Sequence, residues 1–264
     1  MVKLHFPSSL EFLSLLGNNK QLLMLSGQGQ GSSSSSSSDA GSHSSREGSS
    51  LCNILPSTEQ LVSLQISSCS ALLQLPEWPM ALRSLRALKV ISYNYIISLP
   101  LSLKQLTSLQ KLEVVDFKGE LHQLPDWLGE LRSLRSITLN ATPSLRSLPQ
   151  SSAHLTSLQE LYLRWCDVLQ LPEWLGELCS LREFDIWGLK GLTCLPQSTR
   201  HMVTLEGLHI RRCPGLTSLP EWIKDLSALQ RLQIAVCPGL ERRCERGKGE
   251  DWHLISHIPC VWIE

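Results

Sequence analysis

Four residues near the C-terminal end have side chains of the kind that bind metal ions. Cys244, His253, His257 and Cys260 supply two thiols and two imidazoles, which are ligands that structural zinc prefers. The two histidines are four residues apart and would share one face of a helix. The set lacks paired Cys-x-x-Cys spacing, and large apolar residues alternate with its members as in a packed segment. We therefore expect no metal site here.

Catalytic motifs are missing from the sequence. It has no Gly-x-Ser-x-Gly, no clustered carboxylates and no Gly-x-x-x-x-Gly-Lys-Ser/Thr loop for phosphates. Asp185 and His209 form the one conceivable proton-transfer pair, on neighbouring predicted strands, and a cross-strand ion pair is the better interpretation. We expect a protein that is not an enzyme and that binds no cofactor.

Aromatic and cationic side chains recur at short spacing between residues 162 and 212. Tyr, Trp and Arg are the residue types that dominate the energetics of protein interfaces. The equivalent residues of an earlier repeat, Gln65, Ser67 and Ser68, are small and polar. An ordinary exposed face with scattered aromatics is the alternative. The predicted protein-binding residues are Tyr162, Arg164, Trp165, Asp185, Trp187, His209, Arg211 and Arg212.

A repeat of about 24 residues sets the positions of these side chains. A Leu-Pro pair recurs at steps of 24, 25, 24, 23, 24 and 24 residues, and a leucine follows nine residues after each proline. This period, with the spacing L-x-x-L-x-L, is typical of leucine-rich repeats. The prolines are Pro76, Pro100, Pro125, Pro149, Pro172, Pro196 and Pro220.

Apolar and polar residues alternate over a few positions of each repeat, which indicates a short strand. One repeat cannot close its own core, so stacked repeats bury each leucine layer against the next. We predict an α/β solenoid: a leucine-rich-repeat horseshoe with a parallel concave β-sheet and an irregular or short-helical convex side. The inward pairs are Leu64/Ile66, Leu88/Val90, Leu112/Val114, Ile137/Leu139, Leu161/Leu163, Phe184/Ile186, Leu208/Ile210 and Leu232/Ile234.

A second period of about two repeats is marked by Pro-Glu/Asp-Trp, with tryptophans at Trp78, Trp127, Trp174 and Trp222. We expect these tryptophans to pack between neighbouring turns on the convex side; an aromatic ridge for a partner is the alternative. The acid of each motif is expected at the N-terminus of its own helical turn, where the helix dipole favours negative charge.

The chain has nine cysteines, an odd number. Cys69, Cys166, Cys213 and Cys237 occupy one repeat position, where a side chain points inward to the turn backbone. We interpret them as packed free thiols, which favours a reducing compartment.

The composition divides the chain into four parts. Residues 1–26 hold an isolated repeat fragment, and we expect the chain to begin inside a larger protein because no cap precedes this fragment. Residues 27–50 are a Ser/Gly-rich insertion that we expect to be disordered. Residues 51–244 form an array of about eight repeats of 24 residues, and residues 245–264 a C-terminal cap.

Two segments resemble one known family. Leu-Pro-Glu-Trp-Leu-Gly-Glu-Leu (residues 171–178) and Gly-Glu-Asp-Trp-His-Leu-Ile-Ser-His-Ile-Pro (residues 249–259) are similar to the leucine-rich-repeat region of plant intracellular nucleotide-binding leucine-rich-repeat immune receptors, in the coiled-coil class abundant in cereals. The resemblance covers most of residues 51–264, and the family's nucleotide-binding module is missing. It implies pathogen sensing and autoinhibition.

Expected partners are proteins: a pathogen effector, a host protein guarded by the receptor, or the receptor's own nucleotide-binding module. With 24 basic and 24 acidic residues the formal charge is zero, which disfavours nucleic acid. No apolar run reaches membrane-spanning length and the start lacks a signal-peptide core, so we expect a cytoplasmic protein, with the nucleus as a second location. A stand-alone intracellular scaffold and an extracellular ectodomain are the alternatives, the latter disfavoured by the missing cap cysteines.

Overall fold

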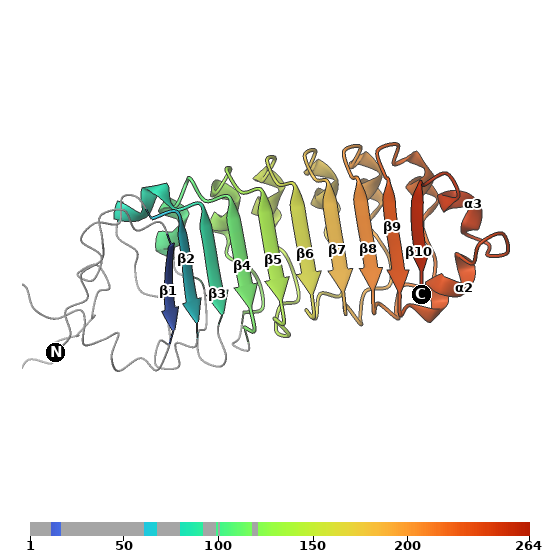
Figure 1. Ribbon diagram of the computed structural model, residues 1–264, viewed down its shortest axis with the longest axis horizontal. Coiled ribbons are helices and arrows are strands. Elements are labelled where there is room, and N and C mark those ends of the chain that lie inside the picture. Colours follow the sequence, from blue (N-terminus) through green and yellow to red (C-terminus); the bar gives the residue numbers. More distant parts are fainter. Residues whose placement is uncertain (1–11, 17–60, 68–79, 92–98, 100, 118–120) are drawn as a thin grey trace, which may run out of the picture.

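The computed structural model describes residues 12–16, 61–67, 80–91, 99, 101–117 and 121–264. Its described strands form one parallel sheet in which each strand pairs with the next along the chain (Figure 1). Equivalent residues of successive repeats are paired, for example Leu161 with Phe184 and Phe184 with Leu208. The strands are β1 (Phe12–Leu16), β2 (Ser63–Ser67), β3 (Ala87–Ile91), β4 (Lys111–Val115), β5 (Ser136–Asn140), β6 (Glu160–Arg164), β7 (Glu183–Trp187), β8 (Gly207–Arg211), β9 (Arg231–Ala235) and β10 (Cys260–Ile263).

Short 3-10 helices lie behind the sheet, one between each pair of successive strands from β2 to β9 (Figure 1). This arrangement confirms the predicted leucine-rich-repeat solenoid. In η5 to η9 the proline of the repeat is the residue before the helix, with extended backbone. The helices are η3 (Met80–Ser84), η4 (Leu101–Gln105), η5 (Asp126–Glu130), η6 (Gln150–His154), η7 (Glu173–Glu177), η8 (Gln197–His201) and η9 (Glu221–Asp225).

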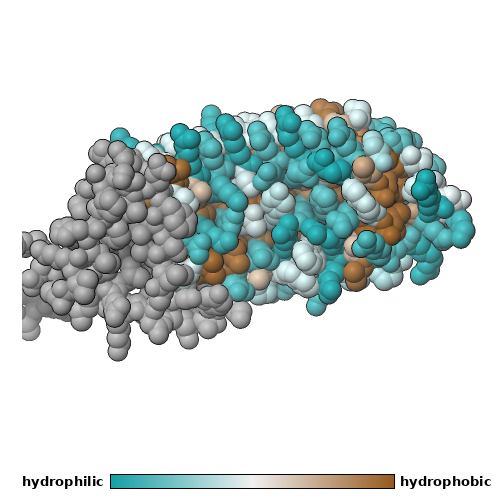
Figure 2. Space-filling view, viewed as in Figure 1, coloured by the Kyte–Doolittle hydropathy of each residue, from teal (hydrophilic) through white to brown (hydrophobic). Residues whose placement is uncertain are grey.

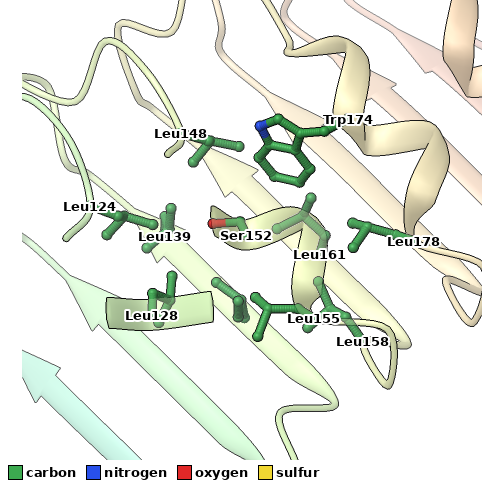
Figure 3. Close-up of a pocket in the computed structure, with 11 residues that line it drawn as sticks. Leu124, Leu128, Leu139, Leu148, Ser152, Leu155, Leu158, Leu161, Trp174 and Leu178 are labelled. Carbon is green, nitrogen blue, oxygen red and sulfur yellow. The ribbon is translucent and has the colours of Figure 1, made fainter. Parts of the chain in front are cut away.

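The core lies between the sheet and the helices. Every predicted inward strand residue is buried, and so are Leu216 and Leu219, which turn the chain over the core after β8. Figure 3 shows a void in this core, lined by Leu139, Leu161, Ser152 and Trp174 among others. The void has a volume of about 10 Å³, too small for anything beyond one water molecule. This void is therefore a small packing defect and has no room for an organic ligand.

A hydrogen-bond ladder follows the end of the strands. The residue after each strand from β4 to β9 has positive φ, between 52° and 56° at non-glycine positions such as Trp165 and Arg212 and 74° at Gly188. Its N–H donates to a carbonyl of the next repeat, as from Trp165 to Trp187 at 2.7 Å. The ladder turns the chain sharply, so residues at this position leave the strand.

The described tryptophans of the Pro-Glu/Asp-Trp motif are buried on the convex side, as expected: Trp127, Trp174 and Trp222. Glu173 differs from the expectation for the motif's acid. Its carboxylate accepts N–H groups of Gln197 and Ser198, at 3.3 and 2.9 Å, which open the next helix, η8. These hydrogen bonds lower the pKa of Glu173. The acid therefore joins two repeats rather than capping its own helix.

Glycine residues allow the helices of two neighbouring repeats to approach each other closely. A Cβ at Gly176 in η7 would lie 2.2 Å from the carbonyl oxygen of Ser198 in η8, and Gly129 in η5 has the same relation to Ser151 in η6, at 2.1 Å. The helices consequently associate in pairs, η5 with η6 and η7 with η8, more closely than η6 with η7. The two-repeat period of the sequence is thus a packing unit.

Three cysteines of the shared repeat position are buried, and their thiols point to the turn backbone as predicted. Cys166, Cys213 and Cys237 donate to carbonyl groups of their own repeat, at 3.3, 3.3 and 3.4 Å. Burial raises the pKa of each thiol, to about 11 at Cys213. In the described part of the chain all cysteines are free.

After the last repeat, the chain forms α2 (Pro238–Arg243), α3 (Trp252–Ile255) and then β10, which extends the sheet beside β9 (Figure 1). Arg243 stands where the repeat would place a leucine. It donates two hydrogen bonds, at 3.0 and 2.6 Å, to the buried carboxylate of Asp251. Asp251 also accepts the N–H of Leu219, at 2.9 Å, so this carboxylate joins the C-terminal segment to the repeats.

Several predictions lie outside the described residues: the insertion at 27–50, most of the fragment at 1–26, Cys69 and Trp78. Among the helices that the structure does describe, none is long and apolar enough to cross a membrane.

Candidate functional site

The structure brings the eight predicted binding residues together on the sheet face of β6 to β8. Tyr162, Asp185 and His209 are paired at the middle of adjacent strands. Arg164, Trp187 and Arg211 are paired at the ends of the same strands. Trp165 and Arg212 follow the strands on the positive-φ ladder. Six of the eight residues form what we call the arginine–tryptophan cluster: Tyr162, Arg164, Trp165, Trp187, Arg211 and Arg212.

Aromatic rings and guanidinium groups stack within the cluster. The rings of Trp165 and Trp187 are 5.9 Å apart between centroids, tilted by 40°. The guanidinium carbons of Arg211 and Arg164 lie 4.6 and 5.9 Å from the Trp187 ring centroid. Such contacts hold a cation over the electron-rich face of the ring. The stack fixes rigid groups in place before a partner arrives.

The outer part of the cluster is Trp165 with Arg212. Arg212 lies over the Trp165 ring, at 5.8 Å from its centroid, and Trp165 is 39% exposed. Gly188 makes room for the indole, because a Cβ there would come within 2.6 Å of the ring. Arg164 also lies over Tyr162, at 5.0 Å, and burial raises the pKa of Tyr162, helped by Glu160 and Glu183.

Asp185 corrects the sequence-based view of an outward contact residue. It lies on the predicted face but is only 1% exposed, because arginines from both neighbouring strands cover it. Its Oδ2 atom accepts Arg164 Nε at 2.9 Å, Arg164 Nη2, and Arg211 Nη2 at 2.6 Å. Asp185 therefore positions two guanidinium groups and is not itself available to a partner.

The predicted pair of His209 with Asp185 does not form. The His209 ring instead has Glu183 Oε2 on one side and Gln233 Oε1 on the other, each at 3.3 Å. Asp185 instead binds Arg164 and Arg211 through its Oδ2 atom, and its Oδ1 atom has no hydrogen-bond partner among the described residues. The two partners of the His209 ring are therefore one neutral amide, Gln233, and one carboxylate, Glu183.

Sequence reasoning missed Glu183, Arg231 and Gln233. Glu183 pairs with Arg231, 48 residues away, and both occupy the first position of their strands. The signal was present, since this position precedes the inward leucine and faces the same side as the middle residue. Gln233 lies at the middle position of β9, beside His209.

The charges of the face divide it into two halves. Glu183 is paired with Arg231, whereas Arg164 and Arg211 of the cluster share the single carboxylate of Asp185, and Arg212 has no ion pair with a described residue. The end of β6 to β8 that carries the cluster is therefore basic and aromatic. Figure 2 shows that this face of the molecule is mostly hydrophilic, with hydrophobic patches toward both ends of the coloured region.

The cysteine and histidine set near the C-terminal end is not gathered into a metal site. Cys244 is buried, with burial raising its pKa to about 12, while Cys260 is exposed. Across the described residues, no group of three or more His, Cys, Asp or Glu side chains is placed to hold a metal ion.

Comparison with protein families gives a match of residues 55–243 to the family described as leucine-rich repeat region. The chain belongs to the leucine-rich repeat family. No curated protein sequence matches this leucine-rich repeat chain significantly. Membership of this family indicates a role in protein–protein recognition.

Solved leucine-rich repeat structures share the fold. A leucine-rich repeat protein of Leptospira interrogans is 24% identical with a TM-score of 0.56, over 71% of this chain and 49% of that one. The leucine-rich repeat domain of the type III effector XopL is 22% identical with a TM-score of 0.59, over 76% of each. The chain spans about half the length of the Leptospira protein. These likenesses establish the architecture alone.

Proposed function

We propose that this leucine-rich repeat chain is the non-catalytic recognition module of a plant intracellular immune receptor. Its role there is to sense pathogen effectors and to hold the receptor in its resting state. Two observations support the proposal: the resemblance of residues 171–178 and 249–259 to coiled-coil-class receptors, and the arginine–tryptophan cluster.

The cluster is the observation that carries the proposal. Trp and Arg are the side chains most enriched among residues that dominate binding energy, and here they are stacked and held by a buried carboxylate. Rigid groups lose little conformational entropy when a partner binds. Two indoles together on a solvent-facing sheet also leave apolar surface in water, which a partner would cover.

The partners proposed are proteins: a pathogen effector, a host protein guarded by the receptor, or the receptor's own nucleotide-binding module. The excess of arginine favours an acidic partner surface with an apolar anchor. Within this proposal the module works in the cytoplasm or the nucleus, residues 51–244 form the recognition array, and residues 245–264 cap it.

The double substitution Trp165→Ala with Trp187→Ala tests the cluster. In a full-length receptor carrying this repeat region, it should weaken partner binding by at least about 2 kcal/mol and either abolish recognition or cause signalling without a pathogen. Trp262→Ala is the matched control, because Trp262 is 47% exposed on the same face but lies on β10. A receptor with the double substitution that binds and signals like its parent would place the site elsewhere.

A further inference from the structure

A polar groove lies where β4 to β7 begin, at the opposite end of the strands from the arginine–tryptophan cluster. Its volume is about 370 Å³, and it is shallow and open to solvent. The residues immediately before the strands line it, together with a row of serines from the preceding turn. Those with charged or hydroxyl side chains are Arg132, Arg135, Ser133, Ser157 and Ser180.

The two arginines of the groove carry uncompensated charge. Arg182 occupies the same repeat position as Arg135, and it pairs with Glu206 of the next repeat at 2.9 Å. The corresponding neighbour of Arg135 is Gln159, which has no charge. Arg132 likewise stands between Thr107 and Thr156 of the adjacent repeats. Neither Arg132 nor Arg135 forms an ion pair with any described residue.

The serine hydroxyls of the groove are also free to bind. Thr204 occupies their repeat position in a later repeat, and its hydroxyl donates to carbonyl oxygens of Cys179 and Leu181 at 2.8 and 2.9 Å. Ser133, Ser157 and Ser180 make no such hydrogen bond within the described residues. The groove thus presents hydroxyl donors beside two unpaired guanidinium groups.

We propose that this groove binds a phosphate monoester. A phosphate monoester carries a charge of about −1.5 to −2 at neutral pH, which matches two arginines better than the single charge of a carboxylate. Guanidinium groups bind phosphate oxygens through paired hydrogen bonds, and serine hydroxyls donate to the remaining oxygen. The phosphate belongs either to a free small molecule or to a phosphorylated side chain of a protein. This site is independent of the arginine–tryptophan cluster.

Titration of the full 264-residue chain with O-phospho-L-serine and with inorganic phosphate, at constant ionic strength, tests the proposal. Saturable binding is expected for both probes. The double substitution Arg132→Gln with Arg135→Gln should weaken it at least about tenfold, since each charge-assisted contact contributes that much. Arg182→Gln is the matched control and should bind like the parent. Thermal unfolding of both variants should be unchanged, because these side chains are exposed.

Two outcomes overturn the proposal: binding that does not saturate for either probe, and equal binding by the double variant and the parent. A second arm identifies the source of the phosphate. A pool of phosphoserine peptides that binds more tightly than O-phospho-L-serine at equal phosphate concentration supports a protein side chain. Equal affinity supports a small phosphate monoester.

Discussion

The carboxylate of Glu183 reaches across β8 to pair with the guanidinium of Arg231 on β9. Gly207 lies between them on β8, and a Cβ there would come 2.0 Å from Glu183 Oε2. The missing side chain of a glycine is therefore what allows two residues from non-adjacent strands to meet.

A double-mutant cycle tests this relationship. With Glu183→Gln and Arg231→Gln, we expect a coupling energy of about 0.5–1 kcal/mol in the parent, since the pair is partly exposed. In the Gly207→Ala background the coupling should fall close to zero, because the new methyl group displaces the carboxylate. Urea unfolding provides the energies. Coupling of the same size in both backgrounds would show that the carboxylate does not need the glycine.

Asp185→Asn should destabilise the fold. The substitution removes the negative charge shared by Arg164 and Arg211 and leaves their guanidinium groups close together. We expect a loss of about 1.5–3 kcal/mol, the range for hydrogen bonds to charged groups. Glu206→Gln is the control, because it removes an exposed ion pair with Arg182 and should cost less than about 1 kcal/mol. Equal effects of the two substitutions in urea unfolding would contradict the special role of Asp185.

The C-terminal segment should weaken in acid. Burial acts to raise the pKa of Asp251, but hydrogen bonds from Arg243 and from the N–H of Leu219 outweigh it, so the pKa lies below its usual value of 3.8. The stabilisation is therefore complete above pH 3.8 and is lost as the pH falls through the lower, folded-state pKa.

Asp251→Asn measures this contribution. We expect it to cost about 1.5–3 kcal/mol at neutral pH and to lessen the decline of stability below pH 4. Glu250→Gln, which removes a more exposed partner of Arg243, should have a much smaller effect. Stability is measured by thermal unfolding from pH 3 to pH 7. An unchanged pH profile in Asp251→Asn would exclude this carboxylate as the acid-sensitive group.

Cysteine reactivity should follow burial. At pH 8 an alkylating reagent should label Cys179, Cys194 and Cys260, which are exposed. It should spare Cys213 and Cys244, whose pKa burial raises to about 11 and about 12. Peptide mapping by mass spectrometry identifies the labelled residues, and unfolded protein is the control in which all should react. A stoichiometric disulfide between any two cysteines would contradict the interpretation as packed free thiols.

The sequence by itself determined the repeat frame. The leucine spacing defines which residues enter the core, so Leu208 and Ile210 could be assigned as buried without coordinates. The same register brought the predicted contact residues to one face. These features follow from the backbone period, which is local and repeated along the chain.

Only the tertiary structure decided which long side chains meet. Asp185 looks outward in the repeat frame, yet Arg164 and Arg211 reach from both neighbouring strands and bury it. Glu183 pairs with Arg231 on β9 rather than with a residue of β8, because β8 has Gly207 at this position. Side chains with several rotatable bonds span more than one strand spacing, so their partners depend on the size and charge of neighbours two repeats away. A periodic pattern fixes the backbone position of such a residue, whereas the packing around it decides where the end of its side chain lies.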